Sequence, residues 1–190
     1  MTQATEEAVI RPATTRDFRT LREIERAAGR VFRDIDMAAV ADDEPPALKV
    51  LQGYVRAGRA WTTERDGHPI AYLIADVVDG NAHIEQVSVH PEHAHHGHGR
   101  ALIEHLARWA ADGAHPALTL TTFLDVPWNG PYYRRCGFRL LAADEISPGL
   151  RTLREHEAAR GLDRWPRGCM RRDLTVGQPP RRAATGQANQ

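Results

Sequence analysis

A glycine-rich turn between a buried strand pattern and an amphipathic helix pattern is the part of this sequence best suited to chemistry. The segment 83–110 reads HIEQVSVHPEHAHHGHGRALIEHLARWA, with Gly97 and Gly99 just before the helical period begins. A helix N-terminus carries unpaired N–H groups and a positive dipole end, and glycine lets an anion approach that backbone closely. The turn therefore predicts an anion site suited to a diphosphate.

Two common nucleotide-binding motifs do not fit this turn. No Gly-Lys-Ser or Gly-Lys-Thr follows, so it is not a Walker loop, and the third glycine and acidic residue of a dinucleotide fingerprint are missing. A Gly-x-Gly turn also occurs without any ligand, because tight turns use glycine for positive φ. The strand before it, the helix after it and Arg100 in the first helical turn favour the anion site.

Two motifs together resemble the GNAT N-acetyltransferase superfamily. V-x-V-x-P followed by G-x-G-R-A-L resembles its acyl-CoA loop, and NGPYYRRCGF at 129–138 resembles its N-x-x-[FY]-Y-x-x-x-G-F segment. The resemblance implies an α/β fold with a mixed central sheet of six to seven strands, flanking helices and a V-shaped acyl-CoA cleft between strands 83–89 and 117–123. The superfamily prefers Gln or Arg, then Gly, where this chain has Ala94 and His95.

The resemblance also implies which residues contact acetyl-CoA. Its pantetheine would pair with the strand backbone, its diphosphate would lie on the amides of the turn, and the Val89 N–H would stabilise the oxyanion. The predicted contacts are Val87, Ser88, Val89, His95, His96, Gly97, His98, Gly99, Arg100, Ala101 and Asn129. Asn129 is also placed to cap a short helix predicted at 131–135.

Acetyl transfer to an amine needs a base, because an ammonium group cannot attack a thioester. Glu85 is our candidate base: strand alternation puts it on the same face as Val87 and Val89. In polyamine-type relatives, a glutamate in the matching position is thought to act through water. His83, two residues earlier on that face, is the alternative base, since the ordinary pKa of histidine suits the task. An edge carboxylate paired with an arginine is the alternative interpretation of Glu85.

The leaving thiolate needs an acid, and Tyr133 is the candidate. It lies four residues before Gly137, which matches the superfamily's tyrosine near the CoA sulfur. A core tyrosine with a backbone partner is the alternative interpretation. Cys136 follows two arginines but has no evident His and Asp partners, so we interpret it as a packing residue.

A histidine-rich stretch, HPEHAHHGH, coincides with the turn. Five of the ten histidines lie in it, at positions 90, 93, 95, 96 and 98. Such a cluster could hold zinc or nickel. Because these histidines occupy the loop assigned to the diphosphate, we predict no required metal.

The acceptor side should combine acidic and aromatic groups, which suit a cationic amine. The candidate lining residues are Phe32, Asp34, Asp36, Asp125 and Trp128. A solvated acidic loop is the alternative. The segment 148–166 is longer than a hairpin between the last strands requires. It covers the acceptor side, meets a second copy in a homodimer, or is a charged surface helix.

Hydrophobic periodicity alternates between the two kinds of element. Strands are predicted at 9–12, 60–65, 70–78, 83–89, 118–123, 138–142 and 169–174, with a hairpin turn at Asp66-Gly67. Helices are predicted from a cap at Thr14 or Thr15 to about Arg30, after Pro45-Pro46, from Gly99, at 131–135 and at 148–161.

The composition sets the remaining limits. The 190 residues suit one domain, 9–174, between disordered tails at 1–8 and 175–190. Equal numbers of basic and acidic residues, 25 each, argue against a nucleic-acid partner, and no apolar run is long enough to span a membrane. Only two cysteines favour a reducing compartment, and we expect a cytoplasmic protein.

These observations predict an acetyl-CoA-dependent N-acetyltransferase. The acetyl group would pass directly to a primary amine in a ternary complex, most simply that of a small molecule. A protein N-terminus or a lysine is the alternative acceptor. A non-catalytic acyl-CoA sensor and a histidine-rich metal-binding protein are the alternatives from other classes.

Overall fold

The computed structural model describes residues 8–174, and their strands form one mixed sheet. The strands follow the order β1-β2-β3-β4-β5-β7-β6, in which β4 and β5 are parallel and the other neighbours antiparallel. They are β1 (Val9–Pro12), β2 (Ala60–Arg65), β3 (His68–Val78), β4 (Asn81–Val89), β5 (Ala117–Phe123), β6 (Arg139–Leu140) and β7 (Arg167–Asp173). The predicted mixed sheet of six to seven strands is confirmed. The predicted tails lie outside the described residues, except for Ala8.

Six α-helices are present in the described part of the chain. They are α1 (Phe18–Gly29), α2 (Ala38–Ala41), α3 (Leu48–Arg56), α4 (His98–Asp112), α5 (Gly130–Arg135) and α6 (Pro148–Ala159). Short 3-10 turns occur at Arg30–Ile35 (η1), Pro91–His93 (η2), Ala143–Glu145 (η3) and Leu162–Arg164 (η4). Only α2 was not predicted, since four residues are too few for a periodic signal. The strand predicted at 138–142 shortens to β6.

The start of α1 differs from the prediction. Neither Thr14 nor Thr15 caps the helix, which follows Asp17 instead. The Asp17 carboxylate turns back and accepts hydrogen bonds from the Thr14 N–H at 2.7 Å and from Arg11 Nη1 at 2.9 Å. Because Asp17 is buried, its charge requires these partners, and they hold the pKa of its carboxyl below the ordinary value against the opposing effect of burial.

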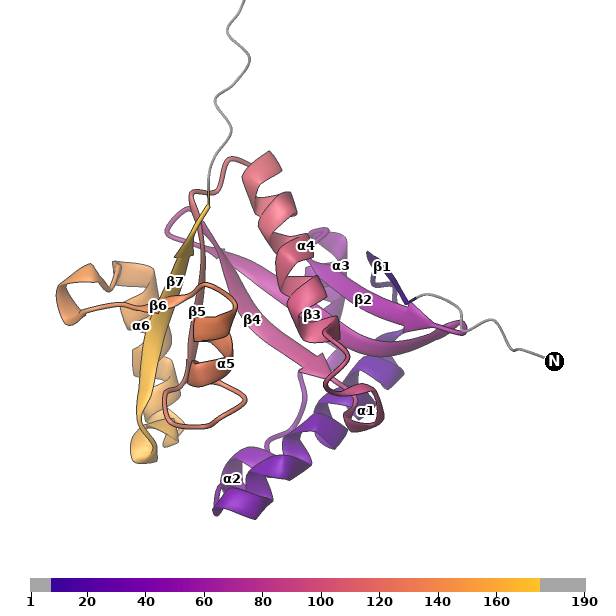
Figure 1. Ribbon diagram of the computed structural model, residues 1–190, viewed down its shortest axis with the longest axis horizontal. Helices are drawn as coiled ribbons and strands as arrows, with labels where there is room; N and C mark the ends of the chain where they lie inside the picture. Colours follow the sequence, from indigo (N-terminus) through magenta and orange to yellow (C-terminus); the bar gives the residue numbers. More distant parts are fainter. Residues whose placement is uncertain (1–7, 175–190) are drawn as a thin grey trace, which may run out of the picture.

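The sheet separates two apolar layers (Figure 1). On one face α4 packs through Leu102 and Leu106 against strand residues such as Leu118. On the other face α1 and α3 pack through Leu21 and Leu51 against Tyr72. Adjacent residues of a strand point to opposite faces, so each strand contributes to both layers.

The strands β4 and β5 are paired at one end only. Their register covers Ala82 with Leu118 and His83 with Thr119, after which no further pair forms. Figure 1 shows the two strands diverging from that end. A register shift opposite Ile74/Ala75 of β3 leaves Glu85 unpaired in β4, which is a β-bulge. The bulge bends β4 away from β5 and produces the predicted V-shaped opening.

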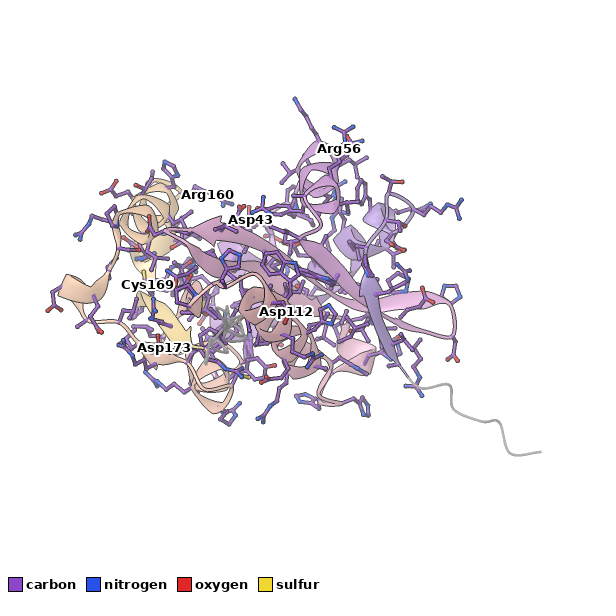
Figure 2. The ribbon with its side chains drawn as sticks, turned by 90° about the horizontal axis from the view of Figure 1, so that it is seen from above. Asp43, Arg56, Asp112, Arg160, Cys169 and Asp173 are labelled. Atoms are coloured by element: carbon purple, nitrogen blue, oxygen red, sulfur yellow. The ribbon has the colours of Figure 1, made fainter. Side chains whose placement is uncertain are left out.

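The helix α6 packs on the sheet face opposite α4. Its residues Leu150 and Leu153 contact Cys169 of β7, whose neighbour Met170 belongs to the α4 layer. In the view of Figure 2, Arg160 at the end of α6 lies on the same side as α3. The segment between β6 and β7 is therefore neither an excursion into solvent nor a simple hairpin.

Candidate active site

Consecutive backbone amides at the start of α4 form an open cradle. Within residues 8–174, no amide from His95 to Arg100 donates a hydrogen bond to the protein, and the next one, Ala101, donates to the Gly97 carbonyl at 2.9 Å. His95 and Gly97 have φ of 65° and 82°, so left-handed residues alternate along the turn. Such an alternation turns successive N–H groups inward and makes a concave site for an anion.

Gly99 lets the backbone of this turn pack closely against α5. A Cβ built at Gly99 would lie 3.0 Å from the Tyr132 hydroxyl and 3.5 Å from Cγ2 of Val89. The glycine therefore brings the helix start, the end of β4 and the NGPYYRRCGF segment together. Two motifs more than thirty residues apart in sequence meet here.

The other predicted contacts of the turn divide into two groups. The side chains of His95, His96 and Arg100 are exposed at the rim. His98 is turned inward: its Nε2 is buried without a partner, and burial lowers the pKa of its imidazole. His98 therefore offers its amide rather than a charged ring. Ala94 is extended and His95 left-handed, so the departure from the superfamily's preferred residues does not prevent the cradle from forming.

The backbone of β4 faces the opening at alternate residues. The His90 N–H bonds to the Ile70 carbonyl at 2.9 Å, and Val89 stands opposite Ala71 in the antiparallel register. Hydrogen-bonded and non-bonded pairs alternate in such a ladder, so the N–H groups of Val89 and Val87 point away from β3. These groups remain available to pantetheine and to an oxyanion.

Ser88 does not share this position. Its backbone points toward β3, and its buried hydroxyl accepts a hydrogen bond from Gln86 Nε2 at 2.8 Å. We therefore remove Ser88 from the expected acetyl-CoA contacts.

The expectation that Glu85 shares a face with Val87 and Val89 is wrong. Both valines pack against the α4 layer, and so does Ile84. The bulge interrupts the alternation and places Glu85 on the opposite face. There the Glu85 charge acts on Tyr54 and Glu25, residues of the α1 and α3 layer.

The environment of Glu85 suits a general base. Its side chain reaches solvent, yet the surrounding protein desolvates the carboxylate and raises its pKa, and repulsion from Asp76 and Glu157 raises it further. Arg160 opposes this shift. A carboxylate with a raised pKa holds a proton more strongly than an ordinary one, as a base working near neutral pH must.

His83, the alternative base, is placed poorly for that role. Its side chain is buried, and Nδ1 lies 3.0 Å from the Thr119 hydroxyl of β5. Burial lowers the pKa of His83 to about 4. Its contact with Thr119 lies where β4 and β5 still pair, so His83 links the two strands just before they separate.

Tyr133 lies on α5 beside the opening. Its ring packs edge-on against Phe138, with centroids 5.8 Å apart, and against Tyr132 at 5.4 Å. Within the described residues its hydroxyl makes no hydrogen bond, and burial raises its pKa. The hydroxyl therefore stays protonated at neutral pH and can donate to a developing thiolate.

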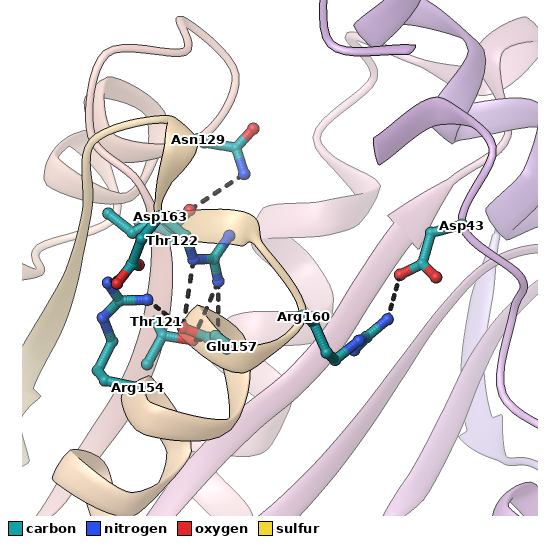
Figure 3. Close-up of polar contacts among 9 residues, drawn as sticks. Asp43, Thr121, Thr122, Asn129, Arg154, Glu157, Arg160 and Asp163 are labelled. Carbon is teal, nitrogen blue, oxygen red and sulfur yellow. Dashed lines mark hydrogen bonds and ion pairs between the residues drawn. The ribbon is translucent and has the colours of Figure 1, made fainter. Parts of the chain in front are cut away.

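Asn129 does not cap α5 as predicted. Its Nδ2 donates to the Thr122 hydroxyl at 3.0 Å, while its Oδ1 is buried without a partner (Figure 3). Thr122 thus takes the amide group that a cap would use in the reverse sense. The unpaired Oδ1 leaves a free acceptor beside Tyr133, which is compatible with the predicted contact to acetyl-CoA.

The predicted acceptor residues separate into an aromatic contact and exposed acids. Phe32 meets Trp128 edge-on at 5.6 Å, whereas Asp34, Asp36 and Asp125 are exposed.

Two bridges across the opening were not predicted from the sequence. Met37 of the η1–α2 segment is buried against Phe123 and Val126, at and beyond the end of β5. Arg160 Nη2 pairs with Asp43 Oδ2 at 2.6 Å, which joins the end of α6 to the segment after α2 (Figure 3). Neither pair has a local sequence signal, because the partners lie far apart in the chain.

A carboxylate network holds the end of α6 in place. Glu157 accepts hydrogen bonds from Arg167 Nη2 at 2.7 Å, from Arg154 Nη1 at 2.5 Å and from the Thr121 hydroxyl (Figure 3). Burial acts to raise the pKa of Glu157, but the hydrogen bonds led by Arg167 outweigh it and lower the pKa. Glu157 is therefore ionised and anchors α6 to β5 and β7.

The histidine-rich loop does not assemble a metal site in the described part of the chain. No group of three or more His, Cys, Asp or Glu side chains between residues 8 and 174 is arranged to hold a metal ion. The histidines meet in pairs, His90 with His93 and His96 with His98, with ring centroids 6.1 and 6.2 Å apart. Also within residues 8–174, no helix combines the length and apolar character needed to cross a bilayer.

Comparison with known proteins decides the family. The acetyltransferase (GNAT) family model matches residues 19–138, more than half of the chain. The chain belongs to this family. It is therefore an acyltransferase, and the resemblance inferred from the two motifs is confirmed.

Solved structures of GNAT proteins share the fold at low sequence identity. The PaiA N-acetyltransferase of Thermoplasma acidophilum, solved with coenzyme A, is 13% identical with a TM-score of 0.67 over 89% of this chain and 100% of that chain. N-acetylglutamate synthase of Neisseria gonorrhoeae is 16% identical with a TM-score of 0.67, over 90% of this chain and 36% of that one. The ribosomal-protein-S18-alanine N-acetyltransferase of Escherichia coli is 18% identical with a TM-score of 0.64, over 92% and 98%.

Proposed function

We propose that this GNAT protein transfers the acetyl group of acetyl-CoA to the primary amine of a small molecule by direct attack in a ternary complex. The observation that carries the proposal is the run of unpaired amides from His95 to Arg100. A buried or half-buried amide without a partner is costly, so six in succession indicate an anionic ligand. The diphosphate of acetyl-CoA fits that requirement.

The residues around the opening can be assigned to the steps of the reaction. Glu85, through water, removes a proton from the acceptor ammonium, and the free amine then forms a C–N bond to the thioester carbon. The N–H groups of Val87 and Val89 face the oxyanion that develops. The C–S bond breaks, and Tyr133 donates its proton to the thiolate. The net products are the acetamide, coenzyme A and one proton.

The two bridges across the opening support a small acceptor. The apolar contact of Met37 with Phe123 and Val126 joins the N-terminal and C-terminal halves on the acceptor side. The exposed Arg160–Asp43 pair adds little stability because solvent screens it, but it occupies the same side. A peptide would have to pass an opening that is spanned at two points, whereas a small amine would not. The cytoplasmic location and the homodimer stay predictions.

Calorimetry and thiol release test this proposal together. The protein is titrated with acetyl-CoA, and thiol release is then followed with small primary amines and with short peptides that carry a free N-terminus or a lysine. We expect micromolar binding and turnover of small amines at least tenfold more efficient than that of peptides. Preferred turnover of peptides would assign a protein acceptor, and absence of binding at millimolar acetyl-CoA would refute the proposal.

A further inference from the structure

Part of the aromatic cluster at the end of β5 remains open to solvent on the acceptor face. The parallel register pairs His83 with Thr119, and its continuation brings Phe123 to the level of Val87. Phe123 points to the same face as Thr119, two strand periods away. That is the face of Glu85, so Phe123 stands across the opening from the proposed site of attack.

Three aromatic rings are joined there. Phe32 meets Phe123 edge-on at 5.9 Å and Trp128 at 5.6 Å. From behind, Phe123 is held by Trp165 at 6.0 Å and by the Arg167 guanidinium, 4.3 Å above its ring. The rings are therefore fixed by packing before any ligand arrives.

The front of this cluster, Phe32 and Trp128, is not covered. Trp128 is 37% exposed and Phe32 is half-buried, whereas Phe123 is buried. A tryptophan left partly in water beside other rings loses the benefit of burial that its surface offers, which is typical of a recognition surface. We call Phe32 and Trp128 the aromatic wall.

Carboxylates surround the aromatic wall and match it to an amine. Asp34, Asp36 and Asp125 are exposed, and between residues 8 and 174 none of them forms an ion pair. A cation approaching Glu85 would pass unpaired negative charge and then ring faces, both of which attract it. The apolar part of the same molecule would lie on the rings.

We propose that the acceptor is a primary amine bearing an aromatic or bulky apolar group, which packs on Phe32 and Trp128 while the amine faces Glu85. This inference rests on the proposed function, because it assumes that an amine attacks in the opening. It adds a selectivity that acetyl transfer alone does not require. An amine without such a group would leave the aromatic wall exposed.

The test compares amines on the full chain with acetyl-CoA. 2-Phenylethylamine, n-propylamine and 1,4-diaminobutane are compared by kcat/KM of thiol release, with each value expressed per concentration of free amine. We expect 2-phenylethylamine to be preferred at least tenfold. Trp128→Ala should reduce that preference at least fivefold and leave n-propylamine within twofold. Leu48→Ala, which shortens an exposed side chain on α3, is the control that should change neither.

A second readout separates this inference from the proposed function. Binding of 2-phenylethylamine to the coenzyme A complex is measured by calorimetry in the original chain and in Trp128→Ala. Equal turnover of all three amines, or equal loss for all of them in Trp128→Ala, would overturn the inference and leave the proposed function standing. Binding that depends on Trp128 without thiol release from any amine would support the aromatic wall and refute the proposed reaction.

Discussion

Replacement of Gly97 by alanine tests the amide cradle directly. Gly97 begins α4 with φ of 82°, and a Cβ built on it meets no protein atom within 4 Å. The methyl group of Gly97→Ala therefore causes no clash inside the protein. It projects into the open space in which the diphosphate would lie. Gly58, after α3, provides a matched control, since its φ is 66° and its Cβ would also be free.

The expected magnitudes follow from these two properties. A left-handed conformation costs an L-residue roughly 1–2 kcal/mol relative to glycine, so both variants should lose similar stability. For a domain of this size that is roughly 2–8 °C in Tm. Only Gly97→Ala should also weaken acetyl-CoA binding. Loss of one charge-assisted hydrogen bond is worth roughly 1.5–3 kcal/mol, which raises Kd roughly 10- to 100-fold.

Calorimetry with two donors makes the result specific. Acetyl-CoA carries the diphosphate and acetylpantetheine lacks it, so Gly97→Ala should weaken binding of the first and leave that of the second unchanged. Gly58→Ala should bind both as the original chain does, and thermal unfolding without ligand checks that the two variants are equally destabilised. Equal Kd values for acetyl-CoA in both variants would refute the assignment of the cradle to the diphosphate.

Three further substitutions test the remaining roles. Tyr133→Phe should keep the Kd of acetyl-CoA within twofold and lower kcat roughly 10²- to 10⁴-fold, measured by calorimetry and thiol release; a matching loss of binding would make Tyr133 structural. Glu85→Gln should remove the acidic limb of the pH–rate profile, which lies above the ordinary carboxyl pKa of 4.5 because the pKa of Glu85 is raised; an unchanged limb would exclude Glu85 as the base. The pKa of His83, lowered to about 4 from 6.5, makes folding stability complete above pH 6.5 and reduces it as pH falls toward 4, by about 2 kcal/mol between pH 7 and 5. Denaturant unfolding of His83→Gln should lose most of that dependence, and a slope equal to that of the original chain would place the titration elsewhere.

The local elements could be predicted because their causes are local. Alternating apolar residues specify a strand, and Asp66-Gly67 specifies its hairpin, in which both residues have the expected positive φ, 52° and 76°. The helical period from Gly99 places Leu102 and Leu106 in the core, as the structure confirms. The two glycine-containing motifs likewise depend on neighbouring residues, so they identified the family before any coordinates were considered.

The face of Glu85 illustrates what local patterns miss. Strand alternation predicts that residues 85, 87 and 89 share a face, and this fails because a bulge adds one residue to β4. A bulge arises from the pairing of two strands and has no reliable signal within one of them. The same holds for Asp17, whose carboxylate turns to Arg11 and Thr14 instead of leaving Thr14 to cap α1.

The sequence by itself determined the sheet, its flanking helices, the anion turn and the acyltransferase family, because these follow from periodicity and from residues close together in the chain. Only the tertiary structure decided which groups meet across the opening. Met37 reaches Phe123, and Arg160 reaches Asp43 across 117 positions. Contacts of such separation depend on how the whole chain packs, since many partners of similar chemistry are available to each residue. The acceptor side is built from those contacts, and it therefore became visible only in three dimensions.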